Sequence, residues 1–243
     1  MIHLLPRQSA QPTAPDWPAC YAEMAQRSQQ SLLKRFYQAG VPDPETPIKN
    51  IALLAMDFET TGLSAKSHSI VSIGLVPFTL DRIPVRHARQ WLVKPRMPLE
   101  NKSVTIHQIT HSDLQQAPDL STHLEELLGL MAGRLCVVHF RGIERPFLDV
   151  AIKARLGQGI TFPVIDTMEL EARLHRTGKG GFLSRLLGKK PTSIRLADSR
   201  QRYNLPYYNA HQAATDALAT AELLQAQIAT HYSPDTPVKD LWV

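Results

Sequence analysis

The sequence contains only two cysteines, Cys20 and Cys136, which lie far apart in the chain of 243 residues. Their separation does not match the close spacing of a cysteine-based metal site. Free thiols of this kind are typical of reducing compartments, although two cysteines alone exclude few locations. We therefore expect reduced thiols and a cytoplasmic protein.

Long apolar runs are also lacking, and no stretch approaches the length needed to cross a bilayer. The N-terminal region is interrupted by prolines and holds no long apolar stretch, which predicts that no secretory signal is present. The apolar content of 43% and the charged content of 20% are typical of soluble globular proteins. A chain of this length can form one sizeable domain with extensions, or at most two small domains.

Acidic residues are scarce between residues 173 and 202, where nine lysines and arginines face only Asp198. This segment carries a charge of +8, which leaves −3 for the rest of a chain whose net charge is +5. A local basic surplus suits a polyanionic partner such as nucleic acid. A solvated basic loop without any partner fits the charge equally well.

The order of the expected elements predicts three parts of the chain. Residues 1–47 would form a tail, an N-terminal helix over residues 17–39 and a Pro-rich linker, and residues 48–232 would form the main domain. Residues 233–243 would form a C-terminal tail. The sequence shows no internal repeat and no low-complexity tract.

The main domain is expected to be α/β. Three strand-like stretches separated by turn residues come first, which indicates an antiparallel meander. Helices and strands then alternate, and this order argues for a three-layer fold around a mixed sheet. The expected strands are residues 51–58, 69–78, 89–94, 135–139 and 163–166, and the expected helices are residues 120–132, 145–156, 167–175, 193–203 and 211–230.

Two carboxylates, Asp57 and Glu59, follow directly on the apolar run of residues 51–56. Side chains two positions apart in a strand point to the same face, so this pair would lie side by side at the end of a buried strand. Such like charges repel unless something positive lies between them. Hard divalent cations take carboxylate oxygens, so the pair predicts a metal site.

A histidine and an aspartate, His211 and Asp216, lie far downstream in a stretch rich in alanine and leucine. These strong helix formers place Asp216 on a helix. Five residues of a regular helix do not bring the two side chains to one face, so His211 is expected in the entry turn. Such a pair alone is usually structural, but together with Asp57 and Glu59 it suggests one catalytic cluster.

These residues resemble the DEDD exonuclease superfamily, in its histidine-bearing DnaQ-like branch. The matching segments are Asp57-Phe-Glu59-Thr-Thr-Gly-Leu63, Val138-His139 with Phe147-Leu148, Asp166-Thr167, and His211 with Asp216. The resemblance covers about residues 50–230 and is strongest to proofreading exonucleases of bacterial DNA polymerases. It implies a ribonuclease H-like three-layer fold with a mixed five-stranded sheet, and hydrolysis of nucleic acid in the 3′→5′ direction.

The resemblance also assigns roles to particular residues. Asp57, Glu59 and Asp216 would hold two divalent ions, Mg or Mn, and His211 would take the proton of the attacking water. Thr60, Thr61 and Leu63 would bind the terminal nucleotide. His107 matches another segment near the substrate, but a histidine that only packs a loop is as plausible there.

One motif departs from the family pattern His-Asn-Ala-x-Phe-Asp, because this chain has Phe140 for the asparagine and Glu144 for the aspartate. Glutamate keeps the charge, so Glu144 is expected to bind metal directly or through water. The alternative is a surface ion pair with Arg141 or Arg145. Asp149 is another nearby acid, but assigning it as the acidic ligand of this motif would shift Phe147-Leu148 out of register with the family pattern.

Asp166 is assigned a structural role, since Asp166-x-x-Glu169 fits a helix capping box. Gln29–Leu33 loosely resembles the short peptide by which bacterial replication proteins bind the sliding clamp. Core contacts of Leu32 and Leu33 are the favoured interpretation of that segment.

The sequence therefore predicts a metal-dependent exonuclease that acts on 3′ ends of single-stranded DNA and releases nucleoside 5′-monophosphates. The alternatives are an RNA-trimming enzyme of the same fold and a non-catalytic nucleic-acid-binding or regulatory module. A further possibility is a subunit whose N-terminal helix docks onto a DNA polymerase or a sliding clamp.

Overall fold

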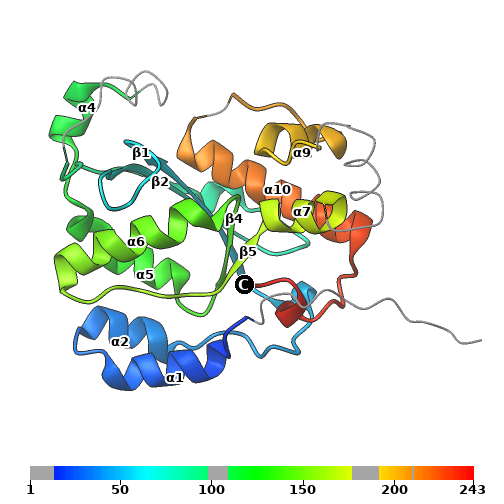
Figure 1. Ribbon diagram of the computed structural model, residues 1–243, viewed down its shortest axis with the longest axis horizontal. Coiled ribbons are helices and arrows are strands. Elements are labelled where there is room, and N and C mark those ends of the chain that lie inside the picture. The colour runs from blue at the N-terminus through cyan, green and yellow to red at the C-terminus, as the bar shows by residue number, and fades with distance from the viewer. Residues whose placement is uncertain (1–13, 98–108, 177–191, 210) are drawn as a thin grey trace, which may run out of the picture.

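The computed structural model describes residues 14–97, 109–176, 192–209 and 211–243. Its centre is a five-stranded sheet with helices on both sides (Figure 1). The strand order is β3-β2-β1-β4-β5. The strands are β1 Leu53–Thr60, β2 Ile70–Phe78, β3 Arg89–Leu92, β4 Leu135–Val138 and β5 Val164–Asp166.

The sheet is mixed, as the sequence predicts. β1, β2 and β3 pair antiparallel, as a meander does, whereas β4 pairs parallel to β1 and β5 pairs parallel to β4. The parallel strands need helical crossovers, and the chain supplies one between β4 and β5. β1 thus lies in the middle of the sheet, where its residues are almost entirely buried.

The helices of the main domain lie close to the expected positions. The expected helix over 120–132 begins as a 3₁₀ turn, and a short helix capped by Thr110 precedes it. α10 packs on β1 and β2, and α6 packs on β1 (Figure 1). The bounds are α4 His111–Gln116, η3 Leu120–His123, α5 Leu124–Met131, α6 Arg141–Leu156, α7 Thr167–Arg176, α9 Leu196–Arg202 and α10 Ala213–His231, with 3₁₀ turns η1 Ile48–Asn50, η2 Val85–His87 and η4 Val238–Asp240.

The N-terminal region forms two helices, α1 Trp17–Arg27 and α2 Ser31–Gln38, so the prediction of one helix over residues 17–39 is wrong. The backbone is extended at Ser28 and Gln30, and buried Ser28 accepts a hydrogen bond from the Gln158 amide at 3.0 Å. This contact with a distant residue is not visible in local propensity, which is why the break was missed.

The two N-terminal helices share the core of the main domain. Tyr21, Phe36 and Tyr37 pack with ring centroids 5.1 to 5.5 Å apart, and α2 contacts α5 (Figure 1). Leu33 is fully buried, which confirms the core contact expected for it. These helices therefore contribute to the same hydrophobic cluster as the sheet.

Residues 233–243 return to the edge of the sheet. Trp242 forms a bridge with Ile165 of β5, and the Val243 N–H donates to the Val164 carbonyl at 2.9 Å. Trp242 is buried in the core cluster. The boundaries at residues 47 and 232 remain predictions. Within the described part of the chain, no helix is long and apolar enough to cross a membrane.

Candidate active site

The site begins at the C-terminal half of β1, which carries Asp57 and Glu59. The alternation of side chains along the strand puts both carboxylates on one face. Asp57 lies directly opposite Gly74 of β2. The face above this pair is therefore the place where a third ligand can approach.

Gly74 is the residue that lets α10 approach the sheet. A Cβ atom at this position would lie 2.1 Å from both the carbonyl carbon and the carbonyl oxygen of Ala213. The first turn of α10 thus packs directly against the backbone of Gly74, opposite Asp57 on the neighbouring strand. Glycine inside a strand is a sequence signal of such close approach, and Gly74 could have indicated this contact.

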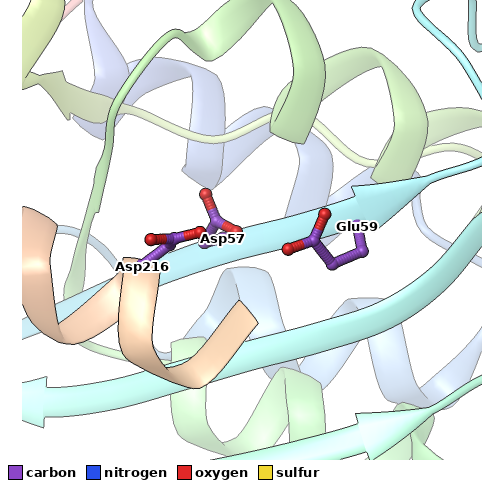
Figure 2. A group of neighbouring side chains, drawn as sticks. All are labelled: Asp57, Glu59 and Asp216. Atoms are coloured by element: carbon purple, nitrogen blue, oxygen red, sulfur yellow. The ribbon is translucent and has the colours of Figure 1, made fainter. Parts of the chain in front are cut away.

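This packing brings Asp216 of α10 to the two carboxylates of β1 (Figure 2). One oxygen from each of Asp57, Glu59 and Asp216 lies within 4.8 Å of the others. Burial, followed by the charges of Asp216 and Glu59, holds the pKa of Asp57 well above its ordinary value. Burial also raises the pKa of Asp216. The repulsion between these like charges favours binding of a cation between the carboxylates.

His211 lies just before α10, in the entry turn where the sequence placed it. Its φ is 74°, which is the left-handed region, and its side chain is exposed. The backbone N–H of His211 donates to Asp216 Oδ2 at 2.9 Å. The turn therefore ties the histidine to the aspartate despite their separation of five residues.

Glu144 lies in the first turn of α6 and is only 3% exposed. Burial and the nearby charge of Asp57 hold its pKa well above the ordinary value. Glu144 Oε2 has no hydrogen-bond partner among the described residues. A buried carboxylate oxygen without a partner is costly, and a bound cation would satisfy it.

The surface ion pair considered for Glu144 does not form, so that alternative is wrong. Arg141 pairs instead with Asp166 at 3.2 Å and with Glu169 at 3.1 Å. The Arg145 guanidinium lies 5.2 Å from the centroid of the Trp17 ring. That Glu144 is a metal ligand remains a prediction.

Asp166 has the structural role predicted for it, and it caps two helices. Its Oδ1 accepts from the N–H groups of Met168 at 3.0 Å and Glu169 at 3.3 Å, in the first turn of α7. Its two oxygens also accept from the N–H groups of Phe140 at 3.1 Å and Arg141 at 3.0 Å. Asp149 is likewise occupied, because Oδ1 accepts from the Ile160 N–H at 2.9 Å.

The expected nucleotide-binding residues follow β1. The Thr60 hydroxyl donates to the Gly62 carbonyl at 2.8 Å, and Thr61 Oγ1 accepts from the Ser69 N–H at 2.9 Å. These bonds shape the turn and leave Leu63 84% exposed. An exposed leucine beside the carboxylates is consistent with an apolar contact to a ligand. His107 lies outside the described residues.

A pocket of about 800 Å³ opens beside the carboxylates. Asp57, Asp216 and His211 line one side of it, and α9 with residues 204–208 lines the other. This second wall could not be predicted from the sequence, because α9 carries no motif of the family. Such a volume is within the usual range of ligand sites.

Comparisons with known proteins identify the family of this chain. A model of the exonuclease family (RNase_T) matches residues 54–224. The PolC-type DNA polymerase III of Thermotoga petrophila is 27% identical over 179 residues, which are 74% of this chain and 12% of that protein. The DNA polymerase III subunit epsilon of Treponema pallidum is 26% identical over 183 residues, 75% of this chain and 79% of that protein. The chain spans 12 to 13% of the length of the PolC-type relatives from two Thermotoga species.

Solved structures show the same fold. Cell-death related nuclease 4 superposes with a TM-score of 0.61 at 19% identity, over 78% of this chain and 67% of that one. The nuclease domain of 3′hExo, a DEDDh family member bound to rAMP, superposes with a TM-score of 0.59 at 14% identity, over 78% of this chain and 96% of that one. These neighbours confirm the expected ribonuclease H-like fold. Because the family match spans most of the main domain and includes Asp57, Glu59, His211 and Asp216, this chain belongs to the RNase_T exonuclease family as a DnaQ-like member.

Proposed function

We propose that this protein is a metal-dependent 3′→5′ exonuclease that releases nucleoside 5′-monophosphates from single-stranded DNA. The observation that supports this most directly is the convergence of Asp57, Glu59 and Asp216 within 4.8 Å, with His211 beside them in the entry turn of α10. The relatives named as DNA polymerase III proteins favour DNA as the substrate.

The carboxylates of Asp57, Glu59, Asp216 and Glu144 would hold two divalent ions, Mg or Mn. When bound, such ions lower the pKa of a coordinated water and stabilise charge on a phosphate. The fit is supported by the raised pKa of Asp57 and by the buried Glu144 oxygen, since a bound cation would favour the charged form of Asp57 and give the Glu144 oxygen a partner. Glutamate in place of the family aspartate would then keep the ligand set complete.

His211 would accept the proton of the attacking water. Histidine is the side chain most often used as a general base in proton transfer at physiological pH. The bond from its backbone to Asp216 holds its Cα near the carboxylates, and its side chain is exposed. Thr60, Thr61, Leu63 and His107 would bind the terminal nucleotide.

A role beside a DNA polymerase, in the cytoplasm, is a further part of the proposal. The relatives suggest such a partner, and the N-terminal helices offer one surface for it. A sliding-clamp contact through Gln29–Leu33 is disfavoured, because Leu33 is fully buried in the core.

The proposal is tested by a time course on 3′-labelled and 5′-labelled single-stranded DNA and RNA, with Mg, with Mn and with chelator. Asp57→Asn removes a carboxylate of the site and should lose more than the ~10–100-fold that an outer-shell change costs. Asp81→Asn makes the same chemical change in an exposed turn between β2 and β3 and should leave the rate unchanged. Equal rates for wild type and Asp57→Asn would contradict the proposal.

Variants of Glu144 distinguish an active enzyme from a module that only binds nucleic acid. If Glu144 binds metal, Glu144→Gln should lower activity and Glu144→Asp should retain it, since aspartate restores the family pattern. An inactive wild type that gains activity as Glu144→Asp would instead indicate a binding or regulatory module.

A further inference from the structure

The second wall of the 800 Å³ pocket is built by α9 and residues 204–208, and it is held in place by Arg200. Arg200 is 4% exposed. Its guanidinium donates to the Ala219 carbonyl at 2.7 Å, to the Pro206 carbonyl at 2.9 Å and to Glu222 Oε2 at 2.8 Å. One buried arginine thus fastens α9 and the segment after it to α10.

Tyr208 is fastened by the same cluster. Its hydroxyl donates to Glu222 Oε1 at 2.9 Å, and the Arg200 guanidinium lies 4.6 Å from the centroid of its ring. Pro206 and Tyr208 are therefore both anchored, and Tyr207 lies between them. Tyr207 is 83% exposed and lines the pocket. An exposed aromatic ring on anchored backbone loses little entropy when a flat ligand stacks on it.

The chemistry of this wall suits a nucleobase better than a phosphate. Of the described residues that line the pocket, Arg200 is the one lysine or arginine, and Glu222 already neutralises it. The remaining wall includes one acid, Asp198, whose charge also disfavours a phosphate, and it combines apolar side chains with two amides and the Tyr207 ring. These residues are Leu196, Ala197, Leu205, Gln201 and Asn204.

The position of the wall indicates which base would bind. Asp57, Asp216 and His211 border the pocket, whereas Leu63 lies past Glu59, beyond the C-terminal end of β1. Figure 2 shows Glu59 further along β1, away from Asp216. A strand whose terminal base lies at Leu63, and whose scissile phosphate lies at the carboxylates, must place its next base on the pocket side.

We propose that Tyr207 stacks on the base of the penultimate nucleotide of the substrate strand, in the pocket formed by α9 and residues 204–208. This subsite rests on the proposed exonuclease function, and it concerns the nucleotide whose 3′ oxygen leaves. The stack would hold the leaving strand across the carboxylates. The enzyme would then need a base at that position, although it need not distinguish which base, because every base has a face for stacking.

The test compares two single-stranded oligonucleotides that differ only in the location of one abasic residue, at the penultimate position or at the fifth position from the 3′ end. The first cleavage step is measured for wild type, Tyr207→Ala and Tyr207→Phe. We expect Tyr207→Ala to lower kcat/KM on intact DNA about 10-fold, the effect of one lost base–aromatic stack. Tyr207→Phe should retain the rate, because the ring remains. Val85→Ala truncates another exposed apolar side chain, 55% exposed, on η2 and serves as the control.

The decisive comparison is the response to the penultimate abasic residue. Wild type should lose about the same factor as Tyr207→Ala, and Tyr207→Ala should lose nothing further. An equal loss in both proteins would overturn the subsite. Equilibrium binding of the same oligonucleotides with Ca²⁺ in place of the catalytic metal gives an independent decision. If wild type cleaves nothing, the proposed function fails. The subsite is then still tested by binding: it is supported if wild type binds the intact oligonucleotide more tightly than the penultimate abasic one and Tyr207→Ala does not, and it is overturned if both proteins show the same preference.

Discussion

At the scale of single residues, the site depends on carboxyl groups in an unfavourable electrostatic environment and on residues with a strained backbone. Asp57 is half-buried and Glu144 is buried, and the pKa values of both carboxyl groups are raised. His211 and Phe140 have positive φ. Such strain persists only where surrounding contacts enforce it. For Phe140 these contacts are the bonds from its own N–H and that of Arg141 to Asp166.

Phe140 gives a direct test of this strain. Its φ is 100° and its side chain is 47% exposed, so replacing it with glycine relieves the backbone strain, and either small residue gives up little buried surface. We expect Phe140→Gly to raise the free energy of unfolding by about 1 kcal/mol relative to Phe140→Ala, which keeps the strain and removes the ring. Chemical denaturation of both variants measures the difference. Equal stabilities would show that the backbone is relaxed here.

At the scale of elements, the site is made where three segments converge: β1, the first turn of α6 and the first turn of α10. The strands and most helices could be predicted, because apolar alternation and helix-forming runs are local signals. The carboxylate pair on β1 and the entry turn at His211 followed from the geometry of a strand and a helix. The pocket wall formed by α9 and residues 204–208 could not be predicted in this way, because the Arg200 contacts that build it join residues up to 22 positions apart.

The approach of α10 to β2 predicts a strong effect of Gly74→Ala. The added Cβ would meet the Ala213 carbonyl at 2.1 Å, so α10 must shift and carry Asp216 away from Asp57. Overpacking of this kind costs about 1–3 kcal/mol of stability. Exonuclease activity should fall more than stability alone explains, which is checked by assaying the variant at a temperature where it is fully folded.

The matched control is Gly129→Ala on α5. A Cβ atom there would meet nothing within 4 Å. Alanine favours helix over glycine by about 1 kcal/mol, so this variant should be as active as wild type and slightly more stable. A fully active Gly74→Ala would contradict the role assigned to the close contact.

At the scale of the whole molecule, the N-terminal helices and the last residues belong to one core with the sheet. Composition and pattern indicated a separate N-terminal helix and linker, because the linker prolines are visible in the sequence. Burial of Trp17 and Leu33, and the return of Trp242 to β5, arise from contacts between distant segments. Such contacts are not encoded in any local pattern.

Removal of residues 1–47 should therefore destabilise the main domain. The truncation exposes the apolar surface that α1 and α2 cover, at a cost of about 25 cal/mol for each Å² uncovered. We expect a lower Tm and self-association, measured by thermal unfolding and by size-exclusion chromatography. A truncated protein with the same Tm and the same oligomeric state as the full chain would show that the N-terminal helices do not stabilise the main domain.

The central claim is that Asp57, Glu59 and Asp216, with Glu144 and His211, form a metal site for hydrolysis at a 3′ end. The most direct measurement is the time course on 3′-labelled single-stranded DNA with Mg or Mn, run for wild type and Asp57→Asn. We expect wild type to release labelled mononucleotide, and we expect chelator and the Asp57→Asn substitution each to abolish that release. Metal-independent release, or release by Asp57→Asn at the wild-type rate, would contradict it.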